Sequence, residues 1–217
     1  MPRFAPLAWI ALVLVGAAPQ GVQADELAEA PETCTIRGVI ETRGRPRGPV
    51  VAYVLGDGPP ATAETTAVIG QKNKSFDQDA VVVAPGAEVA FPNKDAVHHH
   101  LYSHSNQDPF EFPQHAPGAR PTRAFDTPGD VRVQCNIHEN METHVLVLPN
   151  AWATEAEKDG TFELVGVEVG TRTVEAWSAW HRPERVDVVC EPGGVVDITA
   201  TLRMRFPASG PESDGVY

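Results

Sequence analysis

Residues 131–141 read Val-Arg-Val-Gln-Cys-Asn-Ile-His-Glu-Asn-Met, a short strand that runs into a loop containing a thiol, an imidazole and a thioether. Side chains alternate between the two faces of a β-strand. Val131, Val133 and Cys135 therefore share one face, while Arg132 and Gln134 share the other. We expect this strand to be half-buried and the thiol of Cys135 to point toward the core.

Similar short apolar runs, separated by turns, continue on both sides of this stretch. The 217 residues include 18 glycines and 20 prolines, and we find neither a long amphipathic helix nor a heptad repeat. This pattern predicts an all-β fold. Around the opening stretch we expect strands at Val81–Val83, Glu88–Phe91 and His144–Leu148, with a turn at Pro85-Gly86.

The loop after Cys135 favours a soft metal. Seven of the eight histidines lie between His98 and His144. Thiolate and thioether select copper, and two histidines with one cysteine and a weak axial methionine form the ligand set of blue-copper electron-transfer sites. Cys135, His138 and Met141 are the candidates in the loop. Two alternatives are a zinc site, which the methionine disfavours, and a buried core cysteine beside scattered surface histidines.

A second motif supplies the missing histidine. Residues 91–100 read Phe-Pro-Asn-Lys-Asp-Ala-Val-His-His-His. Together with Cys-x-x-His-x-x-Met, this segment resembles the cupredoxin family: the loop is similar to that of amicyanins, and Phe-Pro-Asn-x-Asp-x-x-x-His-His to the first-histidine segment of plastocyanin-like proteins. The resemblance covers residues 66–150 and is nearest to exported cupredoxin-like proteins of the methylamine-utilisation type. It implies a Greek-key β-sandwich with one type 1 copper ion bound by His99, Cys135, His138 and Met141.

The flanking segments carry a weaker resemblance. Thr35–Ile40 and Val50–Leu55 are predicted to form a β-hairpin, and several short strands follow Ala151. These segments resemble a carboxypeptidase-regulatory-like, or transthyretin-like, β-sandwich. The chain would then divide into the two parts of this domain, 34–65 and 151–205, and a cupredoxin domain, 66–150, inserted between them. On that division and the odd cysteine count, we expect a Cys34–Cys190 disulfide.

The ends of the chain indicate export. Residues 1–24 have a basic start, an apolar run and a small-residue cleavage pattern, which predict a signal peptide and a periplasmic location. Residues 25–33 are interpreted as a linker and 206–217 as a flexible tail. No apolar run is long enough for stable membrane insertion. The formal net charge of −12 disfavours nucleic acid and anionic membranes as partners.

Electron transfer is the function these features predict. We find no serine elbow, phosphate loop or haem attachment motif, and assign no catalytic residue. The expected partners are redox proteins, either a basic cytochrome or a periplasmic dehydrogenase, attracted by Glu139 and Glu142. Two other functions stay open: copper binding for delivery, and a metal-free scaffold. His98, His100 and His104 could form an accessory metal site, but we expect them to be solvated.

Overall fold

A computed structural model describes residues 32–205, and its regular elements in that range are all β-strands. The prediction of an all-β chain is confirmed. The predicted signal peptide and tail, and the linker up to residue 31, lie outside the described residues. Within 32–205 no helix has the length and apolar character needed to cross a membrane. The strands are β1 (Thr33–Arg43), β2 (Val50–Val54), β3 (Glu64–Val68), β4 (Gln71–Lys72), β5 (Ser75–Phe76), β6 (Ala80–Ala90), β7 (His99–Ser103), β8 (Phe110–His115), β9 (Thr122–Phe125), β10 (Gly129–Cys135), β11 (Glu142–Val147), β12 (Ala153–Glu155), β13 (Thr161–Glu168), β14 (Gly170–Ser178), β15 (His181–Arg182), β16 (Glu184–Cys190) and β17 (Val195–Met204).

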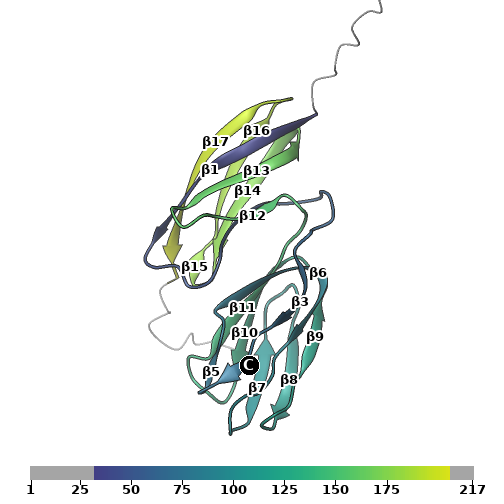
Figure 1. Cartoon of the computed structure of the whole chain (residues 1–217), viewed down its shortest axis with the longest axis vertical. Helices are drawn as coiled ribbons and strands as arrows, with labels where there is room; N and C mark the ends of the chain where they lie inside the picture. The colour runs from purple at the N-terminus through teal and green to yellow at the C-terminus, as the bar shows by residue number, and fades with distance from the viewer. Residues whose placement is uncertain (1–31, 206–217) are drawn as a thin grey trace, which may run out of the picture.

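The flanking domain is built from both ends of the described chain (Figure 1). One sheet has the order β13-β1-β17-β15 and the other the order β12-β2-β14-β16. β1 runs parallel to β17, with Ile36 beside Val196 and Ile40 beside Ala200. Apolar side chains from the two sheets form one core, in which Ile36, Val54 and Leu202 are almost completely buried. Each part of the domain therefore depends on the other for its core.

The predicted hairpin between the first two strands is wrong. β1 lies in one sheet and β2 in the other, so the strands are not hydrogen-bonded to each other. The connection 44–49 crosses between the sheets, and Gly44 and Gly48 both have positive φ angles, of 94° and 77°. Glycine adopts that conformation without steric cost. A Gly- and Pro-rich segment is compatible with a tight turn and with a loop that crosses between sheets, so the sequence pattern alone could not exclude the hairpin.

The central domain contains a sheet of order β3-β6-β11-β10-β7-β8, with β9 also paired to β6. The predicted turn at Pro85-Gly86 is a bend inside one long strand, β6. Before the bend Ala80–Val83 pair with β11, and after it Ala87–Ala90 pair with β9. Gly86 has a φ angle of 83°, which lets the strand change direction and partner without ending.

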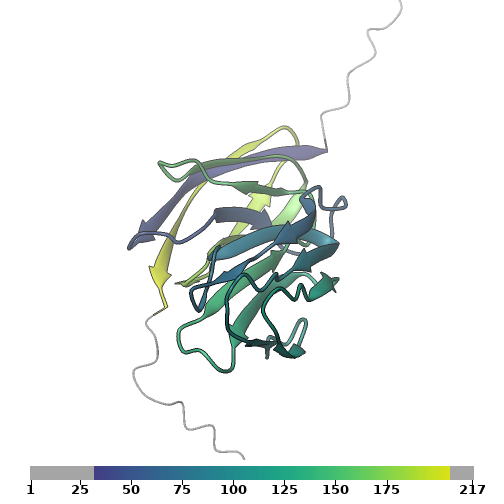
Figure 2. The same ribbon diagram turned by 60° about the horizontal axis from the view of Figure 1, so that its bottom comes forward.

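The two domains pack directly against each other (Figure 2). Val51, Tyr53 and Trp177 of the flanking domain share an apolar cluster with Leu146 and Leu148 of the central domain. The fully buried Trp177 thus serves interdomain packing. A buried contact of this kind restricts relative motion of the domains.

A polar cluster beside this apolar contact centres on His144. Its Nδ1 lies 2.8 Å from Asp130 Oδ1, and its Nε2 lies 3.3 Å from Glu142 Oε1. Burial would lower the pKa of His144, but the two carboxylates outweigh it and the net pKa is raised. Arg205 of the flanking domain also reaches Asp130, at 3.4 Å. His144 is therefore a structural residue at the domain junction.

The predicted disulfide is confirmed. Cys34 of β1 and Cys190 of β16 are bonded, at a sequence separation of 156. Since β1 and β16 belong to different sheets, the bond joins the two layers of the flanking domain as well as its two chain segments. Cys135 is the free cysteine of the described chain, and it is buried.

Candidate metal centre

Three predicted ligands meet at one end of the central domain. His99 begins β7, Cys135 ends β10, and His138 lies in the loop that follows. β7 and β10 are antiparallel neighbours in which Leu101 lies opposite Cys135, and His99 shares the face of Leu101 because it is two residues away. Strand pairing therefore brings the imidazole and the thiol to the same end and the same face.

The three donor atoms form a compact triangle. Cys135 Sγ is 3.8 Å from His99 Nδ1 and 3.6 Å from His138 Nδ1, and the two Nδ1 atoms are 3.2 Å apart. Bonds of about 2.0 Å to nitrogen and 2.3 Å to sulfur, the values for zinc, would give edges of about 3.5 and 3.7 Å around a trigonal ion. The triangle accordingly has the dimensions to hold one metal ion.

The loop that carries His138 is closed by backbone hydrogen bonds. The Cys135 amide donates to the Met141 carbonyl at 3.1 Å, and the Asn136 amide donates to the His100 carbonyl at 2.9 Å. Asn140 has a φ angle of 61°, a left-handed conformation that asparagine tolerates and that reverses the chain. The Met141 side chain is buried in the same apolar cluster as Cys135. Its role as an axial ligand stays a prediction.

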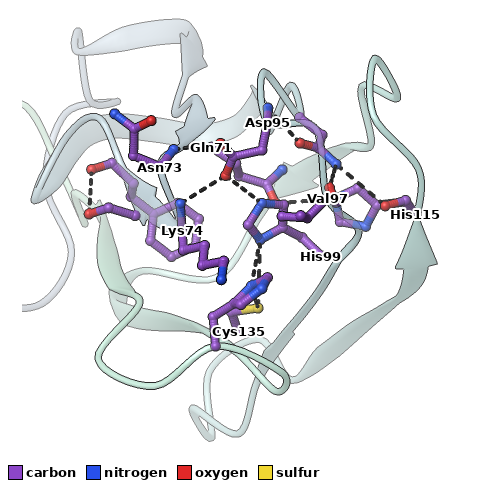
Figure 3. A network of polar contacts seen from close by, with 12 residues as sticks. Gln71, Asn73, Lys74, Asp95, Val97, His99, His115 and Cys135 are labelled. Atoms are coloured by element: carbon purple, nitrogen blue, oxygen red, sulfur yellow. Dashed lines mark hydrogen bonds and ion pairs between the residues drawn. The ribbon is translucent and has the colours of Figure 1, made fainter.

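His99 is oriented by a carboxylate that sequence reasoning missed (Figure 3). Its Nε2 lies 2.9 Å from Asp95 Oδ2. When Nε2–H donates this hydrogen bond, Nδ1 keeps its lone pair, and Nδ1 is the atom that faces Cys135. Carboxylates that fix metal-binding histidines in this way are common in metal sites. Asp95 is therefore the residue that sets the tautomer of His99.

Asp95 is itself held by the turn between β4 and β5. The amides of Asn73 and Lys74 donate to its two carboxylate oxygens at 2.5 and 2.9 Å, and both residues have positive φ angles. Burial would raise the pKa of Asp95, but the Lys74 and Asn73 amides and His99 outweigh that effect and lower it. The pKa of His99 is lowered, chiefly by burial and against the influence of Asp95. At neutral pH the site thus holds an ionised Asp95 and a neutral His99, the form that binds metal.

The other histidines of this region do not join the cluster. His98 is exposed, His100 Nε2 lies 2.6 Å from Glu111, and the His104 ring packs 4.9 Å from the Tyr102 ring. His115 contacts Gln71 Oε1 at 3.2 Å. Within residues 32–205, the only group of three or more histidine, cysteine or acidic side chains spaced to hold a metal ion is His99, Cys135 and His138.

Comparisons with known proteins were made by sequence and by structure. No family model and no curated sequence matches this chain. Among solved structures, a purple cupredoxin from Nitrosopumilus maritimus is 22% identical and covers 37% of this chain and 98% of its own, with a TM-score of 0.34. A Cu(I) amicyanin variant is 18% identical over 44% and 97% of the two chains, with a TM-score of 0.36. A copper-containing nitrite reductase from Thermus scotoductus is 20% identical over 50% and 28%, also at 0.36.

One corner of the donor triangle, His138, lies near the protein surface. His99 is fully buried and Cys135 is 8% exposed, whereas His138 is half-buried and its neighbours Ile137 and Glu139 are exposed. Glu142, which begins β11, has a side chain only 10% exposed and pairs with Arg132. His138 is therefore the donor through which the site is nearest to solvent.

The three adjacent histidines provide a test of the ligand assignment. We expect His99→Ala to lose most bound copper, because it removes a buried donor that Asp95 holds in place. His98→Ala should leave copper stoichiometry and the visible spectrum unchanged, because His98 is exposed and outside the triangle. Copper analysis and absorption spectra of both purified variants give the answer. The opposite pattern would move the ligand to His98 and contradict the site described here.

Proposed function

We propose that this protein is a one-electron carrier with a single type 1 copper site in a cupredoxin domain. The convergence of His99 Nδ1, Cys135 Sγ and His138 Nδ1 within 3.2–3.8 Å carries the proposal. Two imidazoles, one thiolate and a weak thioether are the donors of blue-copper electron-transfer sites. Met141, buried beside Cys135 in the core, is the proposed axial donor.

The protein residues suit a site that exchanges electrons without rearranging. Copper bound to these donors supplies a one-electron Cu(II)/Cu(I) couple. His99 is fixed by Asp95, Cys135 by the end of a paired strand, and the loop by its hydrogen bond from the Cys135 amide to the Met141 carbonyl. Four protein donors would leave no open position for a substrate, by analogy with closed zinc sites. We therefore propose a carrier rather than an enzyme.

We propose the periplasm as its location, on the signal-peptide pattern of residues 1–24 and the Cys34–Cys190 disulfide, which is typical of oxidising compartments. We also propose that the flanking domain is transthyretin-like. Each of its two four-stranded sheets combines a strand from before the central domain with strands from after it, and this arrangement supports the proposal. We propose no chemical role for the flanking domain.

A visible spectrum of the purified protein with one equivalent of copper tests the proposed function. We expect an intense blue species that is bleached by a mild reductant and restored by an oxidant. Colourless copper that passes readily to a chelator would instead support a delivery protein. Failure to bind copper would leave a scaffold as the function. Zinc-loaded protein, which has no redox couple, is the matched control.

We propose that electrons pass through His138 to a redox partner with a basic docking surface, such as a cytochrome or a dehydrogenase. Glu139 is exposed beside His138, and opposite charges accelerate association at low ionic strength. Glu139→Gln should slow electron transfer to a basic cytochrome at low salt by up to about fivefold, the effect of one charge pair at 4 Å in water. The difference should vanish at high salt.

Glu191→Gln is the control for this measurement. Glu191 is exposed on the flanking domain and follows the disulfide cysteine, so the variant has the same net charge as Glu139→Gln. Stopped-flow rates of both variants across ionic strengths separate local steering from overall charge. Equal rates for the two variants, or a wild-type rate that ignores salt, would contradict the docking proposal.

A further inference from the structure

Arginines gather at the end of the flanking domain where β1, β15 and β17 finish close together (Figure 1). Six of the chain's 17 lysines and arginines lie at these strand ends or in the segments that continue from them. This concentration stands out in a chain whose formal net charge is −12. The six residues are Arg43, Arg45, Arg47, Arg182, Arg203 and Arg205.

Three of them form a ladder across three neighbouring strands. β1 and β17 place Arg43 beside Arg203, and β15 and β17 place Arg182 beside Arg203. All three side chains are exposed, while the preceding pair, Thr42 and Leu202, faces inward. Adjacent strands lie about 4.8 Å apart. Three guanidinium groups are therefore attached side by side on the outer face of one sheet.

Such a ladder is unfavourable unless something neutralises it. Like charges directly opposite on neighbouring strands destabilise a sheet, whereas opposite charges stabilise it. The same two strands show the favourable arrangement six positions earlier, where Arg37 lies beside Asp197 and pairs with it at 2.7 Å. At the ladder, Arg203 lies beside Arg43, in the place where the earlier pair has an acidic residue beside an arginine.

Among the described residues, no acidic side chain forms an ion pair with the ladder. Asp79 pairs with Arg47 and Asp130 pairs with Arg205, so these carboxylates are already engaged. Glu184 accepts a hydrogen bond from the Thr201 amide. Glu41, exposed on β1, makes no ion pair among the described residues, and neither do Arg43, Arg182 and Arg203.

We propose that the arginine ladder binds the phosphate group of a soluble anionic ligand. The arginine guanidinium matches phosphate oxygens with paired hydrogen bonds, and three such groups side by side can surround one tetrahedral anion. None of the three ladder arginines lines the open hollow of about 670 Å³ that Arg45, Pro46, Arg47, Gly48, Asp79 and Met204 form, so the proposed contact is the exposed face of the ladder itself. A small free anion is favoured over a phospholipid headgroup because it meets mainly the ladder, whereas a whole anionic membrane also faces the acidic remainder of a chain whose net charge is −12.

Calorimetric titration of the full chain with inorganic phosphate and with pyrophosphate tests the proposal. We expect saturable binding at low ionic strength, tighter for pyrophosphate. Arg203→Gln, which removes the centre of the ladder, should weaken binding at least about tenfold, the value of one charge-assisted hydrogen bond. Arg37→Gln is the matched control, because Arg37 lies on the same sheet face but is paired with Asp197. It should leave the dissociation constant unchanged.

Two further measurements make the result decisive. Without phosphate, Arg203→Gln should keep or raise the melting temperature of the wild type, since it removes repulsion, so a loss of binding cannot be ascribed to misfolding. Cys135→Ala should bind phosphate as the wild type does, which separates this site from the metal centre. The proposal is overturned if neither anion binds, if Arg37→Gln weakens binding equally, or if only phosphatidylglycerol vesicles bind.

Discussion

Cys135→Ala is expected to abolish the blue colour of the copper-loaded protein completely. Cys135 supplies the only thiolate among the proposed ligands, and a soft thiolate ligand selects copper over harder metal ions. Cys135 is also central to the triangle's geometry, because its Sγ is within 3.8 Å of both imidazole Nδ1 atoms. Absorption spectra at equal copper loading give the measurement. A variant that stays intensely blue would show that the thiolate is not a ligand.

Met141→Leu is the matched comparison in the same loop. Leucine fills a similar apolar volume, so the buried cluster around Met141 should be kept. We expect copper to remain bound and coloured while the reduction potential rises, because loss of a weak axial donor disfavours Cu(II). Redox titration followed at the blue band measures the change. If colour is lost as fully as in Cys135→Ala, Met141 has a different role from the one proposed.

Replacement of both Cys34 and Cys190 by alanine should have the largest effect on stability. A disulfide that closes a loop of this length is worth about 4–5 kcal/mol in the chain-entropy model, although measured values are often smaller. The bond joins the two sheets and the two chain segments of the flanking domain, so its loss should fall mainly on that domain. Urea unfolding followed by circular dichroism measures the change.

The copper band serves as the internal control in that experiment. The metal centre lies in the central domain, whose apolar core is separate from the one that contains Cys34 and Cys190. Under native conditions the double variant should therefore show the spectrum of the wild type. A lost copper site would instead mean that the central domain depends on the disulfide. Unchanged urea unfolding would refute the stabilising role of the bond.

Local sequence patterns predicted where strands occur better than how they pair. Alternation correctly placed Cys135 at the buried end of a strand, because that pattern depends only on neighbouring residues. It could not distinguish a hairpin at 44–49 from a crossing between sheets. Nor did it distinguish a turn at Pro85-Gly86 from the bend within β6. Those outcomes depend on partners far away in sequence.

The candidate site also shows this difference between local patterns, which the sequence reveals, and distant partners, which it does not. Cys135, His138 and Met141 lie within one loop, so their spacing could be read directly, whereas His99 was chosen among three adjacent histidines through a family resemblance. Asp95 was missed because its importance depends on the Asn73-Lys74 turn, more than 20 positions earlier in the chain. A carboxylate four residues before a metal-binding histidine was the signal available.

The interrupted flanking domain has a consequence for the order of folding. β1 and β2 are made first, yet their hydrogen-bonding neighbours β12, β13, β14 and β17 come after the whole central domain. The central domain is complete by the end of β11, so it can fold before the partner strands of β1 and β2 have been synthesised. Until then, the backbone edges of β1 and β2 remain unpaired. Unpaired edges invite aggregation. A chain stalled after residue 150 would therefore carry a finished metal centre beside an exposed, unfinished sandwich, and would be a preferred substrate for chaperones and proteases.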